Sequence, residues 1–124
     1  MGKLAAHLAE LPSFATAMIK TDEINFDKGE YKAAVVANRA ELLALFDKGA
    51  AEAREAIAGA TDDHLRQNWK MIYQAKPLFD APRAAGIRGM MMNHLVHHRG
   101  QLTVYLRLND IAVPAIYGPS ADEM

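Results

Sequence analysis

One continuous apolar stripe does most to limit the folds open to this chain of 124 residues. It lies in the segment AAVVANRAELLALFDKGAAEAREAIAGA, residues 33–60. Apolar side chains recur there at steps of three and four residues, at Val36, Ala40, Leu43, Phe46, Ala50, Ala53 and Ile57. This spacing places them on one face of an α-helix. Because such a face must be buried against other elements, the segment predicts a helix in a bundle.

Two more segments carry the same spacing. Residues 2–23 predict a first helix, which Pro12 is expected to kink or split because proline lacks an amide hydrogen. Residues 82–110 predict the last long helix, with Pro82 near its first turn. A short helix is expected after Thr61 or Asp62, either of which can cap it.

The remaining segments lack helical spacing. Residues 24–32 read as a loop, and residues 111–124 as a proline-rich ordered tail. Residues 68–86 predict a short extended or irregular connection that packs three side chains on the core, namely Trp69, Ile72 and Phe79. We therefore expect one domain, residues 1–124, with an all-α, up-and-down helical bundle. The count of long helices is one short of a closed four-helix bundle.

Composition excludes several classes of protein. The chain has no cysteine, which rules out disulfides, thiolate metal sites and a cysteine nucleophile. The net charge of −1 gives no basic patch for nucleic acid, so a DNA-binding stress protein is disfavoured. The N-terminus lacks the pattern of a signal peptide, and no stretch approaches the ~20 apolar residues of a membrane span. A cytoplasmic protein is the expectation.

Histidines stand on the apolar side of the last predicted helix. His94 and His98 are four residues apart and therefore lie one turn apart on one face. Buried imidazoles need partners for their nitrogens, and a divalent metal can serve both rings at once. A single histidine on such a stripe is more often a hydrogen-bonded core residue, and the residues of this pair alone leave both interpretations open.

His7 is the natural third ligand, because it lies on the apolar side of the first helix. Three histidines with open positions are typical of a catalytic metal site. Glu10, one turn after His7, is the candidate catalytic residue, placed to orient a ligand or a metal-bound water. His97 is assigned a role in supporting either the ligands or the fold, and His64, among polar residues, is expected to be exposed. Met90, Met91 and Met92 are expected to fill the core.

The segment NHLVHHRGQLTVYLRLNDIAVPAIYGPSADE, residues 93–123, closely resembles the C-terminal signature of the DinB-like (damage-inducible, YfiT-type) family. It contains the His-x-x-x-His-Arg-Gly-Gln core of that signature. Residues 2–14 resemble the helix of the family's first ligand, with His7 at the histidine position, and residues 39–71 resemble its middle helix and tryptophan-bearing turn. The resemblance covers nearly the whole chain.

This resemblance implies a four-helix bundle that holds a divalent metal, usually zinc or nickel, on three histidines that correspond to His7, His94 and His98. Some members of the family are S-transferases or isomerases that use a low-molecular-weight thiol. The resemblance therefore implies a metal-dependent enzyme, an S-transferase or hydrolase with a thiol cosubstrate and a small-molecule substrate. The alternative is a non-catalytic stress-response bundle that binds a metal or ligand.

Other residues of the signature have expected supporting roles. Gly100 is expected to allow close helix packing, while Arg99 and Gln101 support the site or the fold. Tail residues Tyr117, Asp122 and Glu123 either cover the mouth of the site or have a structural role.

Members of the family usually have a further long helix before the segment GKLAAHLAE, whereas here Met1 stands almost at its start. A bundle without that helix would expose an apolar strip, which monomers avoid. We therefore expect a homodimer in which a second copy covers the strip.

Overall fold

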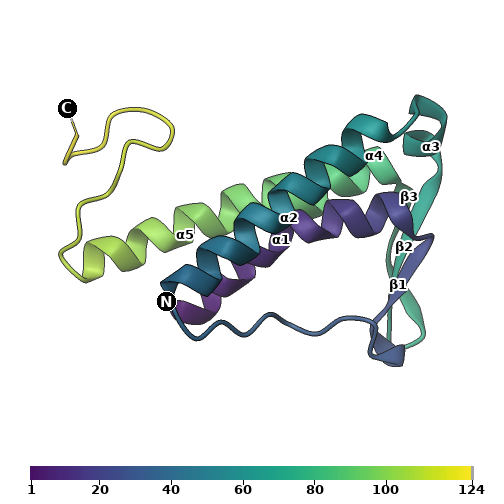
Figure 1. Ribbon diagram of the computed structural model, residues 1–124, viewed down its shortest axis with the longest axis horizontal. Helices are drawn as coiled ribbons and strands as arrows, with labels where there is room; N and C mark the ends of the chain where they lie inside the picture. Colours follow the sequence, from purple (N-terminus) through teal and green to yellow (C-terminus); the bar gives the residue numbers. More distant parts are fainter. Residues whose placement is uncertain (124) are drawn as a thin grey trace.

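Helices and one small sheet make up the fold of the computed structural model, which describes residues 1–123 (Figure 1). The helices are α1 (Gly2–Lys20), α2 (Arg39–Gly59), α3 (Asp62–Arg66), α4 (Arg83–Gly86) and α5 (His94–Leu108). A short 3-10 helix, η1 (Phe26–Lys28), and a π-helical segment, η2 (Ile87–Asn93), complete them. The strands are β1 (Glu23–Asn25), β2 (Asn68–Tyr73) and β3 (Lys76–Pro82). The chain is mostly helical, as predicted, but the sheet means that it is not all-α.

The helices lie along one another on one side of the molecule, and the sheet closes one end of them (Figure 1). Helix α1 contacts α2, η2 and α5, and is therefore the helix on which the others assemble. Pro12 is buried inside α1 and does not split it, contrary to one of the two outcomes expected. No helix within residues 1–123 combines the length and the apolar character that a bilayer crossing demands.

Helix α2 begins at Arg39, six residues later than predicted. Asn38 caps it, because the Asn38 side chain accepts from the Glu41 amide at 2.9 Å and donates back to the Glu41 carboxylate at 3.0 Å. Such a reciprocal cap fixes where a helix starts. The predicted stripe is only partly buried: Ala53 is in the core, whereas Leu43 is 49% and Phe46 is 39% exposed. Ile57 packs against the core as well, so the exposed part of the stripe lies in the first half of α2.

The connection between α3 and α4 is extended, one of the two forms expected, and its two strands pair as a β-hairpin. β2 pairs antiparallel with β3 and parallel with β1, in the order β1-β2-β3. The turn residues Gln74 and Ala75 have φ angles of 51° and 57°. Residues other than glycine rarely adopt this left-handed backbone conformation. The Asp27 carboxylate holds the turn by accepting from the amides of Gln74 at 2.9 Å and Ala75 at 2.8 Å.

Elements α4, η2 and α5 follow one another without a break and form one helical rod, residues 83–108. The core lies where the sheet meets α1, α2 and the start of this rod. Six buried side chains form it, namely Ala15, Met18, Ala53, Trp69, Met71 and Ile87. The prediction that the connection would pack on the core is confirmed for Trp69 and for Phe79, while Ile72 is half-buried. Two of the three consecutive methionines, Met90 and Met91, pack against this core, but Met92 is exposed.

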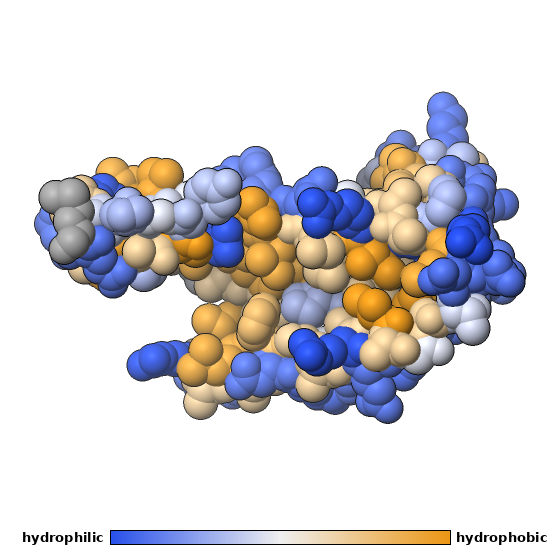
Figure 2. Space-filling model, turned by 90° about the horizontal axis from the view of Figure 1, so that it is seen from above, coloured by the Kyte–Doolittle hydropathy of each residue, from blue (hydrophilic) through white to orange (hydrophobic). Residues whose placement is uncertain are grey.

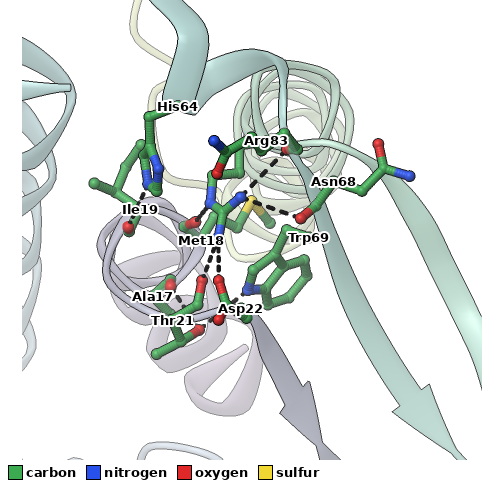
Figure 3. A network of polar contacts seen from close by, with 10 residues as sticks. Ala17, Met18, Ile19, Thr21, Asp22, His64, Asn68, Trp69 and Arg83 are labelled. Atoms are coloured by element: carbon green, nitrogen blue, oxygen red, sulfur yellow. Dashed lines mark hydrogen bonds and ion pairs between the residues drawn. The ribbon is translucent and has the colours of Figure 1, made fainter. Parts of the chain in front are cut away.

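Arg83 ties the end of α1 to the hairpin (Figure 3). Its side chain is 1% exposed, and its guanidinium donates to the carbonyl oxygens of Met18, Thr21, Gln67 and Asn68 and to the Asp22 carboxylate. These carbonyls include the ends of a helix, which otherwise lack partners. His64 makes a similar link, with its Nε2 2.8 Å from the Ile19 carbonyl oxygen. His64 is therefore half-buried and not exposed as predicted, because α3 packs on the end of α1.

Candidate metal centre

Three histidines from the two ends of the sequence meet between α1 and α5. His7 comes from α1, and His94 and His98 come from the first turns of α5. The Nε2 atom of His94 lies 3.4 Å from Nε2 of His7 and 2.8 Å from Nε2 of His98. One ring nitrogen from each of the three lies within 4.8 Å of the other two, so this group could hold a metal ion.

The second nitrogen of each ring has an acceptor of its own. These Nδ1 contacts are His7 to Glu10 Oε1 at 2.8 Å, His94 to the Met90 carbonyl at 3.3 Å, and His98 to Gln101 Oε1 at 2.6 Å. A carboxylate, a carbonyl and an amide oxygen can only accept, so each Nδ1 carries the proton in a neutral ring. Each Nε2 atom then carries a lone pair and no proton, and the three lone pairs converge on one another.

This arrangement does not satisfy itself with hydrogen bonds. Two lone pairs 2.8 Å apart need either a shared proton or a cation between them. Burial lowers the pKa of His94, the hydrogen bond to the Met90 carbonyl opposes this shift, and the neighbouring histidines lower the pKa again, for a net decrease. A proton is therefore poorly held at the centre of the group. The donor set fits a divalent metal, because neutral imidazole nitrogens are common ligands of such ions.

Glu10 is a buried carboxylate that links the histidines to the rest of α1. It is 6% exposed and accepts from His7 Nδ1 at 2.8 Å, the Tyr31 hydroxyl at 2.7 Å and the Ala34 amide at 2.7 Å. Burial raises the pKa of Glu10, but the hydrogen bonds from His7, Tyr31 and Ala34 outweigh it and keep the pKa below the ordinary value. Burial and the bond to Glu10 raise the pKa of Tyr31 to about 12. At neutral pH Glu10 is thus a carboxylate that supplies negative charge beside His7.

The π-helical segment η2 sits directly before the two histidines of α5. It begins at the buried Ile87 and carries Met90, whose carbonyl accepts from His94. π-helical turns inside α-helices occur frequently at functional sites. From His94 onward the helix is regular, so His94 and His98 are stacked one turn apart, with ring centroids separated by 4.5 Å.

The other signature residues divide into those that touch the site and those that do not. Gln101 contacts His98, which agrees with the first of the two roles expected for it. His97 is exposed with its ring 4.9 Å from that of His98, and within residues 1–123 it makes no hydrogen bond to the three histidines. Gly100 is not a close-packing position, because a Cβ atom there would meet nothing within 4 Å among the described residues. No short-range sequence signal pointed to Tyr31, which reaches Glu10 from 21 residues away.

The tail is anchored to α5 rather than to the histidines. Asp122 accepts two hydrogen bonds from Arg107, at 3.0 and 2.7 Å, and one from the Val113 amide. Glu123 accepts from the Ala115 amide at 2.7 Å. Tyr117 is 99% exposed. These contacts agree with the structural role, one of the two alternatives for this segment.

Comparisons with known proteins identify the family of the chain. A model of the DinB superfamily matches residues 1–102, and a model of the DinB family matches residues 89–124. The chain is 35% identical over 63 residues to the "Uncharacterized protein YrdA" of Bacillus subtilis (strain 168). That alignment covers 51% of this chain and 34% of the relative, so it spans about a third of the relative's length. No solved structure matches the chain significantly.

Proposed function

The chain belongs to the DinB superfamily, and we propose that it binds one divalent metal ion on His7, His94 and His98. The observation that carries this proposal is the convergence of three Nε2 lone pairs, each fixed by an acceptor on the opposite side of its ring. Acceptors of this kind orient the ligands of metal sites and raise their basicity. Glu10 would orient His7 in this way.

Zinc or nickel is the metal that we propose, since imidazole ligands suit both. Three protein ligands leave coordination positions open, which is the arrangement of catalytic sites. A bound ion would supply Lewis acidity and lower the pKa of a coordinated thiol. We therefore propose a metal-dependent S-transferase or hydrolase that uses a low-molecular-weight thiol and acts on a small molecule.

A non-catalytic metal- or ligand-binding protein is the second candidate, and one observation favours it. Glu10 is the carboxylate that contacts the histidine group, and three donors already occupy its two oxygens. A carboxylate so engaged is poorly placed to accept a proton from a substrate. Addition of a thiol to Co²⁺-loaded protein separates the two candidates: a thiolate-to-cobalt absorption band supports the enzyme, and an unchanged spectrum supports the binding protein.

Metal content tests the site itself. We expect elemental analysis of untagged protein to find about one zinc or nickel per chain, and a His94→Ala/His98→Ala variant to lose it. His97→Ala is the matched control, because His97 is an exposed histidine on the same helix. It should keep the metal. A parent protein that stays metal-free after reconstitution with Zn²⁺ and with Ni²⁺ would contradict the proposal.

We also propose that two copies of the chain associate. Large apolar side chains are exposed on both long helices beside α1: Leu43 and Phe46 on α2, and Val96, Val104, Tyr105 and Leu108 on α5. Figure 2 shows apolar side chains gathered along the middle of one face, and a hollow between the arm that carries the tail and the rest of the body. Surfaces of this kind mark interaction sites. Light scattering at low micromolar concentration tests the proposal, and a clean monomer there contradicts it.

A further inference from the structure

Residues 29–38, which we call the strap, run beside α1 without helix or strand (Figure 1). The strap leaves η1 near the sheet and returns along α1 to the start of α2, close to the N-terminus. Several of its side chains face solvent, and Val35 is 93% exposed. A segment with so few buried side chains has little packing of its own to hold it in place.

Glu10 is the point on α1 to which the strap is fastened. The Tyr31 hydroxyl donates to Glu10 Oε1 at 2.7 Å, and the Ala34 amide donates to Glu10 Oε2 at 2.7 Å. The Tyr31 ring packs beside two other rings, with centroid distances of 5.5 Å to Phe14 and 5.3 Å to Phe26. These ring contacts hold Tyr31 in place beside the Glu10 carboxylate.

The same oxygen of Glu10 that accepts from Tyr31 also accepts from His7 Nδ1, at 2.8 Å. A planar carboxylate can serve these two donors and the Ala34 amide together only in one orientation. If the strap leaves, Glu10 loses two of its three partners and is free to rotate away from His7. The orientation of the His7 ring therefore depends on the position of the strap.

We infer that Tyr31 is a positioning residue of the metal centre, and that docking of the strap and metal binding are linked through Glu10. This inference rests on the proposed function, because it assigns a regulator to that same site. Linkage of this kind is reciprocal: a docked strap strengthens metal binding, and a bound metal holds the strap by the same factor. Tyr31 thereby acts on the metal through two other side chains and touches neither metal nor substrate.

The test compares Tyr31→Phe with the parent protein. Phenylalanine keeps the ring contacts with Phe14 and Phe26 and removes only the hydroxyl. We expect its affinity for Zn²⁺, measured by competition with a chelator, to fall about tenfold, the lower end for partners of a metal ligand. The visible spectrum of the Co²⁺-loaded variant should also change, since the His7 ring is less firmly oriented. A side chain that only supports the fold would not alter that spectrum.

Tyr73→Phe is the matched control. The Tyr73 ring also lies near Phe26, at 6.4 Å, but its hydroxyl makes no hydrogen bond within residues 1–123. This variant should bind Zn²⁺ like the parent and give the parental Co²⁺ spectrum. Thermal unfolding of the metal-free variants checks that each has folded.

Hydrogen exchange provides a readout that needs no substitution. We expect Zn²⁺ to slow exchange of the Ala34 amide in the parent protein several-fold, and to slow it less in Tyr31→Phe. Unchanged affinity and spectrum in Tyr31→Phe, or strap exchange that Zn²⁺ leaves unaltered, overturns the inference and leaves the metal site standing. A parent protein that binds no Zn²⁺ overturns the proposed function, and the inference falls with it.

Discussion

The Nε2 atoms of His94 and His98 lie 2.8 Å apart, while the Nδ1 atom of each ring is hydrogen-bonded to an acceptor on its own helical rod. For His98 that acceptor is the side chain of Gln101, which is exposed. We predict that Gln101→Ala weakens Zn²⁺ binding several-fold, but less than Glu10→Gln does. The reason is that water can replace the exposed Gln101 amide, whereas glutamine at position 10 loses the negative charge beside His7 and sets an NH2 group against a buried donor. Chelator competition measures both affinities, with His97→Ala as the unaffected reference.

Arg83 should be among the most sensitive positions for stability. Arg83→Met leaves the carbonyls of Met18, Thr21 and Asn68 without their side-chain donor, while the Gln67 carbonyl keeps the backbone amide of residue 83. We therefore expect the free energy of unfolding to fall by about 3 kcal/mol. Urea unfolding of the metal-free protein measures this loss. Arg66→Met is the control, because Arg66 is exposed and its ion pairs with Asp62 and Asp63 are worth less than about 1 kcal/mol. Equal effects of the two substitutions would show that the Arg83 contacts do not stabilise the fold.

The hairpin turn offers a stabilising substitution. Ala75 has a φ of 57°, a conformation that glycine adopts without a steric penalty. Ala75→Gly should therefore raise the free energy of unfolding by about 0.5–1 kcal/mol. Ala84→Gly, in helix α4, should lower it by a similar amount, since glycine weakens helices. A destabilised Ala75→Gly protein would contradict the role that we give to this turn.

Acid should release the tail. The hydrogen bonds from Arg107 and from the Val113 amide lower the pKa of Asp122 and outweigh the opposite effect of burial. A carboxyl with a lowered pKa in the folded state stabilises it above the unfolded pKa, and that contribution is lost as the pH falls through the folded value. Tail docking should thus be complete at neutral pH and weaken below the ordinary pKa of 3.8. Hydrogen exchange of the Val113 amide reports on tail docking, because this amide donates to Asp122. In the Asp122→Asn variant the same amide should exchange fast at neutral pH as well.

The histidine site was predictable from the sequence because each part of it follows from helical spacing. His94 and His98 are one helical turn apart, and His7 stands on the apolar side of a helix that packs beside them. Tyr31 was not predictable, since only the path of the strap across α1 brings its hydroxyl to Glu10. The roles of the three histidines as ligands and of Glu10 stay predictions.

The hairpin was missed for a similar reason. Turns of this kind usually contain Asn-Gly or Asp-Gly, whereas the two turn residues here are Gln74 and Ala75. The missing turn signal is supplied by Asp27, from a segment far away in the sequence, which binds both turn amides. The start of α2 was predicted too early because the apolar stripe continues before Asn38. The cap that Asn38 forms with Glu41 makes the helix begin at Arg39.

The π-helical segment η2 has one more consequence, for the register of the last helical rod. A π turn uses one residue more than an α turn. The residues after it are therefore rotated by about 100° from the positions that an uninterrupted α-helix would give them. Gly86 and Ile87 can therefore lie in the core beside Met18, while His94 and His98 meet His7 farther along α1. Loss of one residue between 88 and 92 would keep the rod helical and its core anchored. It would nevertheless turn both imidazoles away from His7. The rod should therefore tolerate substitutions at its exposed positions between 88 and 92 but not a change in its length there.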